Sequence, residues 1–363
     1  MRVGIITITN NGMNYGNQLQ NYAVIKCLNN IGIEKVDTLY NLDGVEFLAS
    51  KKRKIKNYIK EKLKKGNYCI LKKERKFDKF GKKYLNYTKP FTGMLSKNES
   101  EKYDYFVCGS DQIWNLNFKC NYIHYPFIFM KFAPKEKCIG FSISMGVSEY
   151  SGEKEKVLKN GIDNFKAISV REQSGQKLIK NISGIDSKLL LDPTMLIDKK
   201  DWINIMKKPE GINGKYLLCY FLGEISAETK KIIEVWSKHN KLQIVMLNCD
   251  ETDENIKTAG PQEFIYYFLN ADLVCTDSFH GTVFSILFET PFVVFDRKDS
   301  SESSNEKMSS RLETLLYRFS FTSRFKKYLN EEKLLNMNFE NSNKILLEER
   351  KKAEKYLKES MNI

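Results

Sequence analysis

The sequence predicts an α/β protein with two Rossmann-like domains, each built on a parallel sheet. Three observations support this fold class. The chain has 363 residues, which is too long for one ordinary core and favours two domains of roughly 150–200 residues. Short β-branched or aromatic runs alternate with longer helical patterns. The apolar runs end in polar, glycine-containing loops, which is typical of parallel strands covered by helices.

The first half of the chain carries the first α/β series. The apolar run RVGIITIT (2–9) is followed by an Asn/Gly loop and a predicted helix from about Gln18 to Asn30. Leu19, Ala23 and Cys27 recur every four residues, so they share one helical face. Further strands are predicted at EKVDTLY (34–40), YDYFVCGSD (103–111), KCIGFSISMG (137–146), FKAISVRE (165–172) and SKLLLDPT (187–194).

A linker, KKPEGINGKY (207–216), separates this series from a second one. The second series has predicted strands at 215–223, 242–249, 271–277 and 291–295, and predicted helices at 226–239, 261–270, 280–289 and 309–319. We therefore predict an N-terminal domain at 1–206 with a basic helical insert at 51–85, a C-terminal domain at 207–329 and a helical tail at 330–363. Two such domains favour a ligand-binding cleft between them, outside the carboxyl ends of the strands.

The net charge of the chain is +14, from 59 basic and 45 acidic residues. This balance suits an anionic partner, which can be a nucleic acid, an acidic membrane surface or a charged substrate. Much of the excess lies in residues 51–83, which are either a solvated helical face or a surface for anionic lipid headgroups. No nucleic-acid-binding motif is present, so we do not expect a nucleic-acid partner.

The eight cysteines form no C-x-x-C motif, and several lie inside apolar runs. This pattern predicts reduced, packed thiols in a cytoplasmic protein, without a zinc site or another metal site. The N-terminal apolar run is too short for a signal peptide. No run approaches the roughly 20 apolar residues of a membrane-spanning helix.

Two candidate sites lie in the first domain. In the loop and helix at 10–23, Gly12 and Gly16 permit unusual backbone shapes, and the helix start offers free N–H groups. One interpretation is that Asn14, Asn17 and Gln20 bind sugar hydroxyls. The other is that this segment is a flexible loop with an ordinary Asn cap. The motif GSDQIWN (109–115) follows a strand. Ser110 and Asp111 are of helix-capping types, and the motif also resembles a carbohydrate platform, with an aromatic face beside hydrogen-bonding groups; the two roles can coexist.

Arg171 ends a predicted strand in the motif SVREQSG. It is either an ordinary surface arginine or a permanent cation whose planar fork binds a carboxylate or phosphate. As a surface ligand-binding residue, it could be replaced by alanine with loss of turnover and little loss of thermal stability.

The stretch CTDSFHGTVFSILFETPFVVF (275–295) holds His280, one of only three histidines. The motif TDSFHG falls at the carboxyl end of a predicted strand, and the residues before the histidine are of helix-capping types. His280 would lie in the first helical turn, where the dipole lowers a histidine pKa and favours anions. It is either a packed residue or a proton donor and acceptor. After the next strand, a Ser-rich loop is flanked by Arg297, Lys298 and Arg311; it is either solvated or a binding loop.

Six fragments, in this order, resemble the polysaccharide pyruvyl transferase family: NYGNQLQNYA, GSDQIWN, FSISMG, SVREQSG, LDPTML and TDSFHGTVFSILFETPFVVF. The resemblance covers most of the chain. It implies two Rossmann-like domains arranged as in GT-B glycosyltransferases, phosphoenolpyruvate as the donor substrate, and a pair of glycan hydroxyls as the acceptor. The product would be a pyruvate ketal, as in surface polysaccharide biosynthesis, with no cofactor needed. We expect the enzyme in the cytoplasm or peripheral to the inner face of the membrane.

By the resemblance, Arg171 matches the arginine of the family's R-E segment, and His280 matches the histidine of its H-G segment. Relatives carry arginine two residues before this histidine, where the chain has Ser278; Arg297 or Arg311 would then supply the charge. The predicted catalytic residues are His280 and Asp277. The predicted donor-binding residues are Arg171, Ser278, Gly281, Arg297 and Arg311. The predicted acceptor-binding residues are Asn14, Tyr15, Gly16, Asn17, Gln20, Ser110, Asp111, Gln112 and Trp114.

Two alternatives remain open at the level of the sequence. A GT-B glycosyltransferase would need a group for the nucleotide ribose in the second domain, and only Glu289 stands out in the segment HGTVFSILFE. A non-catalytic glycan-binding relative of the enzyme would explain a loss of donor binding through Ser278.

Overall fold

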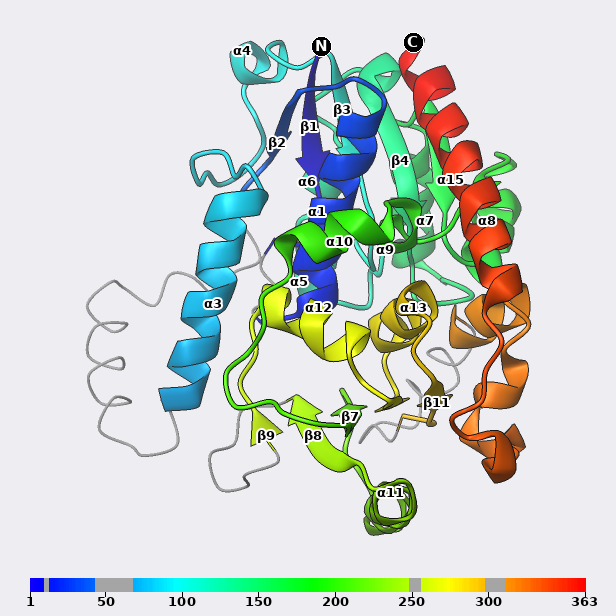
Figure 1. Cartoon of the computed structure of the whole chain (residues 1–363). Coiled ribbons are helices and arrows are strands. Elements are labelled where there is room, and N and C mark those ends of the chain that lie inside the picture. Colours follow the sequence, from blue (N-terminus) through cyan, green and yellow to red (C-terminus); the bar gives the residue numbers. More distant parts are fainter. Residues whose placement is uncertain (10–12, 43–67, 248–255, 298–310) are drawn as a thin grey trace. The chain divides into compact units, whose positions relative to one another are not determined.

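A computed structural model describes residues 1–9, 13–42, 68–247, 256–297 and 311–363 of the protein (Figure 1). The chain divides into two compact units. The first unit comprises Met1–Leu63, Lys79–Ile197 and Glu348–Ile363, and the second comprises Lys64–Asp78 and Asp198–Leu347. The second unit thus begins before the predicted linker, and the predicted tail is shared between the two units. The Ser-rich loop, Gly12 and most of the basic insert lie outside the described residues.

The first unit is built on a six-stranded sheet in which every pair of neighbours is parallel. Its strands are β1 (Arg2–Ile6), β2 (Lys35–Thr38), β3 (Tyr105–Cys108), β4 (Cys138–Ile143), β5 (Ala167–Val170) and β6 (Lys188–Leu189), in the order β2-β1-β3-β4-β5-β6. Val3 of β1 lies opposite Val36 of β2 and Tyr105 of β3. Each of the six strands falls within a segment predicted to be a strand. The strand order reverses between β1 and β3, and ligands of such sheets bind at that point.

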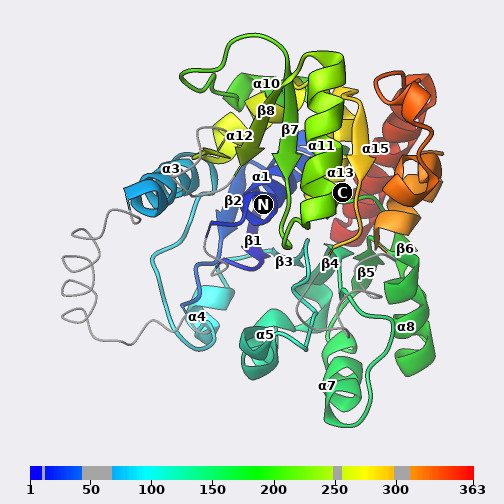
Figure 2. The same ribbon diagram turned by 90° about the horizontal axis from the view of Figure 1, so that it is seen from below.

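Helices cover both faces of this sheet. The helices of this unit are α1 (Tyr15–Asn30), α4 (Lys97–Ser100), α5 (Lys119–Ile123), α6 (Tyr125–Ile128), α7 (Glu153–Ile162), α8 (Gln173–Ser183), α9 (Pro193–Leu196) and the 3-10 turn η1 (Lys135–Lys137). Figure 2 shows α7 and α8 on one face and α1 on the other. Val157 of α7 and Leu178 of α8 pack into the same core as Phe106, Ile168 and other inward strand residues. The buried apolar strands therefore have helices on both sides, as their composition predicts.

Two long helices pass from one unit to the other: α3 (Tyr68–Tyr84) and α15 (Glu340–Met361). The end of α15 belongs to the first unit because Tyr356 stacks on Phe141 of β4 and donates a 2.6 Å hydrogen bond to the carbonyl of Gly140. Tyr105 of β3 also donates to the carbonyl of Met361, at 2.9 Å. The last part of the charged tail, Glu348–Ile363, therefore packs as part of the first unit. Among the described residues, we find no helix with the length and apolarity that crossing a membrane requires.

The second unit has a five-stranded parallel sheet. Its strands are β7 (Tyr216–Tyr220), β8 (Gln243–Leu247), β9 (Ile256–Lys257), β10 (Leu273–Thr276) and β11 (Phe292–Val294), in the order β11-β10-β7-β8-β9. Its helices are α10 (Lys199–Ile205), α11 (Ala227–Asn240), α12 (Pro261–Leu269), α13 (Phe279–Phe288), the turns η2 (Thr322–Arg324), η3 (Lys326–Tyr328) and η4 (Glu331–Lys333), and residues 311–318. Figure 1 shows α11 on one face of the sheet and α12 and α13 on the other. The strand order reverses between β7 and β10, which is a second topological switch point.

Buried thiols give the fold a predictable response to alkaline pH. Burial raises the pKa of Cys138 and of Cys219 from 9.0 to about 12. In the unfolded chain these thiols ionise above about pH 9, whereas in the folded chain they keep their protons. Their contribution to stability is therefore fully present below pH 9 and is lost as the pH rises toward 12, by up to about 1.4 kcal/mol per pH unit for each thiol.

We expect the free energy of unfolding in urea to fall between pH 9 and pH 10.5, and to fall less steeply in Cys219→Ala. The matched control is Cys120→Ala, because Cys120 is exposed and its removal should leave the slope unchanged. Equal slopes in wild type and Cys219→Ala would contradict the assignment of this loss to the Cys219 thiol.

Candidate functional site

Polar side chains gather at the switch point of the first sheet, where the segments after β1 and β3 diverge. Gln20 of α1 joins them. Its amide nitrogen donates to Oγ1 of Thr7 at 2.6 Å, and its amide oxygen accepts from the backbone N–H of Ser110 at 2.9 Å. Asn17, one helical turn earlier, donates to Oδ2 of Asp111 at 3.3 Å. The predicted groups Asn17, Gln20, Ser110 and Asp111 therefore lie together, and all four are buried.

Arg171 lies inside this cluster. Its side chain is 1% exposed, and its guanidinium contacts Asp192 at 2.5 Å, Asp111 at 3.1 Å and Glu172 at 3.7 Å. Burial alone lowers the pKa of Arg171, but the charges of Asp192, Asp111 and Glu172 outweigh that effect and leave the pKa raised. One cation thus faces three carboxylates. The structure places Arg171 as an internal partner of carboxylates and not as the exposed surface cation that the sequence suggested.

The partners of Arg171 are themselves held by several hydrogen bonds. Asp192 caps α9, since Oδ1 accepts from the backbone N–H and the hydroxyl of Thr194 at 3.0 and 2.6 Å. Glu172 accepts from the backbone N–H groups of Met145 and Gly146 at 2.8 and 3.3 Å. The hydroxyl of Ser110 donates to Oδ2 of Asp192 at 3.1 Å. This network fixes the loops after β3, β4 and β5 to one another.

The other residues predicted for the acceptor have different surroundings. Asn14 is the N-cap of α1, and its side chain accepts from the N–H of Asn17 at 3.1 Å. Tyr15 and Gly16 are buried in the first turn of that helix. Gln112 accepts from the amide of Asn115 at 2.7 Å.

Trp114 corrects the expectation of a carbohydrate platform. Its side chain is 0% exposed, and its ring packs against Phe129 and Phe165, with ring centroids 5.0 Å apart in each pair. A sugar stacks only on an accessible aromatic face. Trp114 therefore anchors the loop after β3 to the core.

The second unit places a corresponding cluster at its own switch point. Asp277 follows β10, and its two carboxylate oxygens accept from the backbone N–H groups of Leu222 and Gly223 at 2.7 and 2.8 Å. Arg297 also contacts Oδ2 of Asp277, at 3.3 Å. Asp277 therefore ties the loop after β7 to the loop after β10. The catalytic role expected of Asp277 beside His280 stays a prediction.

His280 lies in the first turn of α13, as the sequence predicts. Ser278 is the N-cap, with its hydroxyl accepting from the N–H of Gly281 at 3.3 Å. The ring of His280 lies edge-on to Phe279 at 5.4 Å, and the guanidinium of Arg311 lies 6.0 Å from the centre of the same Phe279 ring. His280 is 8% exposed. The imidazole of His280 and the guanidinium of Arg311 therefore both lie near the ring of Phe279. Arg297 contacts Asp277, which precedes the same helix.

A side chain at Gly281 would have no room in this turn. A Cβ atom there would lie 2.4 Å from Oγ1 of Thr276. That hydroxyl donates to the carbonyl of Tyr220 at 2.6 Å and accepts from the N–H of Ser278 at 3.0 Å. Gly281 therefore permits the close approach of α13 to β10, which sets the position of His280.

We expect Gly281→Ala to lower the free energy of unfolding by about 1–3 kcal/mol, because the new methyl group must displace Thr276. The matched control is Gly175→Ala in α8, where the nearest atom would lie at an ordinary 3.5 Å and the change should be neutral or stabilising. Urea unfolding of both variants measures the difference. A Gly281→Ala variant as stable as Gly175→Ala would contradict this prediction, because it would show that Thr276 can move aside without loss of stability.

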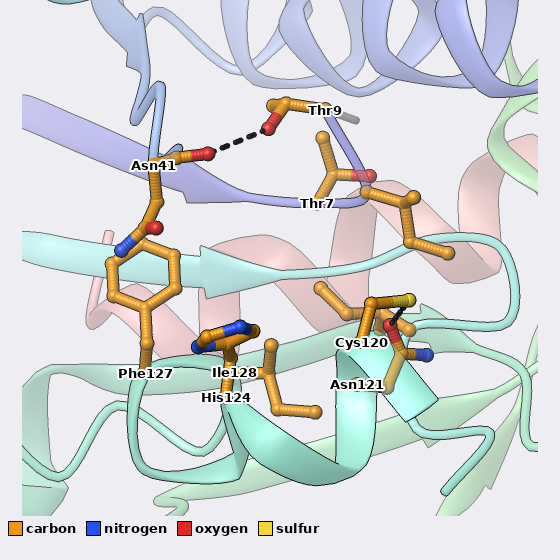
Figure 3. A pocket seen from close by; sticks show the side chains of 10 residues that line it. Thr7, Thr9, Asn41, Cys120, Asn121, His124, Phe127 and Ile128 are labelled. Atoms are coloured by element: carbon orange, nitrogen blue, oxygen red, sulfur yellow. Dashed lines mark hydrogen bonds between the residues drawn. The ribbon is translucent and has the colours of Figure 1, made fainter. Parts of the chain in front are cut away.

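Sequence reasoning missed two features of the first unit. Asp192 and Glu172 were not predicted as site residues, although Asp192 precedes proline in LDPT, a pattern typical of a helix N-cap. The second feature is a pocket of about 50 Å³, shown in Figure 3. His124 and Asn121 line it, together with Thr7 and Asn41. No single motif in the sequence marks this pocket, because its lining comes from four separate segments: 7–9, 41, 113 and 120–128.

Comparisons with known proteins identify one family and several distant solved structures. The model of the polysaccharide pyruvyl transferase family matches residues 14–300. A search of the curated proteins gives no match. Among solved structures, the chain is similar to UDP-GlcNAc 2-epimerase from Neisseria meningitidis bound to UDP-GlcNAc, with 11% identity, a TM-score of 0.44 and coverage of 97% of this chain and 100% of the other. It is also similar to the glycosyltransferase SnogD from Streptomyces nogalater, with 11% identity, a TM-score of 0.43 and coverage of 99% and 96%. Because the family model spans most of its length, the chain belongs to the polysaccharide pyruvyl transferase family.

Proposed function

We propose that the protein transfers the three-carbon unit of phosphoenolpyruvate to two hydroxyls of a glycan precursor and forms a pyruvate ketal. One proton adds to the methylene carbon of the donor, which becomes a methyl group. The two hydroxyl oxygens bond to the adjacent carbon, and the C–O bond to phosphate breaks. The hydroxyls release two protons in total, of which one balances the proton on the methyl group and the other leaves with phosphate. No oxidant or reductant is needed.

The observation that carries this proposal is the position of His280 in the first turn of α13. An imidazole there can deliver the proton to the methylene carbon. The phosphate and carboxylate of the donor require cationic partners. Arg297, which contacts Asp277, and Arg311, which lies near Phe279, are cations close to His280. The N–H groups at the start of α13 favour the same anionic substrate. In this assignment Ser278 serves as the helix cap, and the arginines supply the charge that relatives obtain from the residue at this position.

We assign the acceptor to the first unit. Asn17 and Asp111 form the part of its polar cluster that faces the β1–β3 switch point, and Asp111 keeps 11% of its side chain exposed. Its carboxylate can accept a hydrogen bond from a sugar hydroxyl. Arg171 then acts on the acceptor side as the partner that holds Asp111, and its predicted role in donor binding is the competing proposal.

A direct test incubates the protein with phosphoenolpyruvate and a panel of glycosides in D₂O. Acceptor-dependent phosphate release, together with a ketal methyl group that carries one deuterium, is the expected result. Arg297→Gln should raise the KM for phosphoenolpyruvate more than it lowers kcat. Turnover of a nucleotide sugar instead would identify a glycosyltransferase, and glycan binding without turnover would identify a non-catalytic relative; either result overturns the proposal.

A membrane-associated acceptor is part of the same proposal. Within α3, the exposed cations Lys72, Arg75, Lys79 and Lys82 recur at spacings of three and four residues, which places them on one helical face. Such a stripe suits an anionic lipid surface. Binding to a membrane at the cytoplasmic face remains a prediction.

A further inference from the structure

The pocket of the first unit lies beside the polar cluster of the proposed acceptor site. Thr7, which follows β1, lines the pocket and accepts the 2.6 Å hydrogen bond from Gln20. Gln20 in turn accepts from the backbone N–H of Ser110, next to Asp111. Ile113, in the loop after β3, also lines the pocket. The pocket and Asp111 therefore share the two loops that diverge at the switch point.

The pocket has a rigid apolar side. Ile8, Ile113, Phe127 and Ile128 contribute to its lining. The ring of Phe127 is held between two others: it lies edge-on to Phe91 at 5.7 Å and stacks on Phe132 at 5.6 Å. A methyl group against these side chains would bury apolar surface without moving them.

The rest of the lining can form hydrogen bonds. Figure 3 shows Thr7, Thr9 and Asn41 on one side of the pocket, and Cys120, Asn121 and His124 on the other. Asn41 is fixed by a 2.7 Å bond to the carbonyl of Gly93, and Asn121 by a 2.9 Å bond to the carbonyl of Gln112. The half-buried imidazole of His124 has no side-chain hydrogen-bond partner among the residues that the structure describes. It can donate to or accept from a ligand.

The size and charge of the pocket limit what can enter. A water molecule needs about 10–15 Å³, so a pocket of about 50 Å³ has room for about four non-hydrogen atoms. A whole sugar ring is too large. The lining has no carboxylate, ammonium or guanidinium group among its described residues, so an ionised amine or acid would lose hydration without gaining a charged partner.

We infer that this pocket holds the acetamido group of an N-acetylated acceptor sugar. Its methyl group lies on the apolar side formed with Phe127, and its amide bonds to the polar side that includes His124. A hydroxyl in the same place would leave the apolar side unfilled. The inference rests on the proposed function for the identity of the sugar as acceptor, and the sugar ring outside the pocket then directs its hydroxyls toward Asp111.

The test measures binding of methyl glycosides of N-acetylglucosamine, N-acetylgalactosamine and N-acetylmannosamine to the full chain. Each is compared with its free amine and its parent hexose. Saturation-transfer NMR should give the strongest transfer at the acetyl methyl of at least one N-acetyl sugar. Cys120→Phe is expected to weaken that binding at least tenfold, because Cys120 lines the pocket and its thiol makes only a 3.5 Å contact with Asn121.

Two control variants separate filling of the pocket from general damage. Ile123→Phe adds bulk on the same helix at a side chain that is 54% exposed and does not line the pocket, and Cys120→Ser keeps the size of Cys120. Both should change binding less than twofold. Equal binding of hexose and N-acetyl sugar, no binding of any sugar, or unchanged binding in Cys120→Phe would each overturn the inference.

The inference and the proposed function can fail separately. If plain hexosides support phosphate release from phosphoenolpyruvate as well as N-acetyl sugars do, pyruvyl transfer stands and the acetamido pocket is wrong. If an N-acetyl sugar binds with the expected loss in Cys120→Phe and no acceptor releases phosphate, the pocket stands and the proposed reaction is wrong.

Discussion

Replacing His280 with alanine is expected to lower kcat for ketal formation by about 10²–10⁴-fold, the range typical of a lost general acid. The donor's methylene carbon is a poor base, so it needs a positioned proton, and His280 in the first turn of α13 can provide one. Binding of phosphoenolpyruvate should change much less, because Arg297 and Arg311 remain. Acceptor-dependent phosphate release measures kcat and KM for the variant.

The free energy of unfolding of the His280→Ala variant shows whether its loss of kcat comes from missing chemistry or from damaged packing. His280 is 8% exposed and lies against Phe279, so a small cost of about 1 kcal/mol is expected on general grounds. His280→Gln, which keeps much of the size and polarity, should be as inactive as His280→Ala but closer to wild type in stability. The matched control is His239→Ala in α11, an exposed histidine of the same unit.

Two results would count against His280 as the acid. An active His280→Gln variant would show that the imidazole is not needed for proton transfer. A His280→Ala variant that unfolds while His280→Gln keeps full activity would support the alternative that His280 is a packing residue.

The sequence was a good guide to the elements and a poor guide to contacts between them. Apart from β9, the predicted segments enclose the observed strands, because short apolar runs between polar loops carry their own signal. The start of α12 was also predictable, since Pro261 stands at its first position. The two-residue strand β9 was missed because Ile256 is the only large apolar residue in ENIKTAG, whereas the equally short β6 lies in the apolar run KLLL.

Burial was harder to predict than secondary structure. Trp114 was interpreted as a surface platform because its neighbours in GSDQIWN are polar, yet the chain returns to bring Phe129 and Phe165 against its ring. Arg171 lies 60 residues from Asp111 and 21 from Asp192 in sequence. Only the order of strands in the sheet brings these three residues together, and no local pattern contains that order.

This placement of Arg171 reverses the expectation that its removal would leave stability nearly intact. We expect Arg171→Met to lower the free energy of unfolding by about 3–5 kcal/mol, because it removes one partner of a buried ion network. Asp192, Asp111 and Glu172 would then face one another without the cation, and the hydrogen bonds from Ser110 and Asn17 would not offset their repulsion. The free energy of unfolding of Arg171→Lys should lie between those of wild type and Arg171→Met, since one ammonium cannot reach as many carboxylate oxygens as the planar guanidinium.

A second substitution tests whether the cost is electrostatic. Asp192→Asn in the Arg171→Met background removes one of the unpaired carboxylates while keeping an oxygen that can still cap Thr194. The double variant should therefore be more stable than Arg171→Met alone, although Asp192→Asn by itself destabilises the wild type. Urea unfolding of the four proteins at pH 7 gives the coupling energy between the two side chains, which should be large for groups in direct contact. A stable Arg171→Met variant that has lost only affinity for phosphoenolpyruvate would contradict this account and restore Arg171 as a donor-binding residue, because an arginine reserved for substrate leaves no buried charge behind when it is removed.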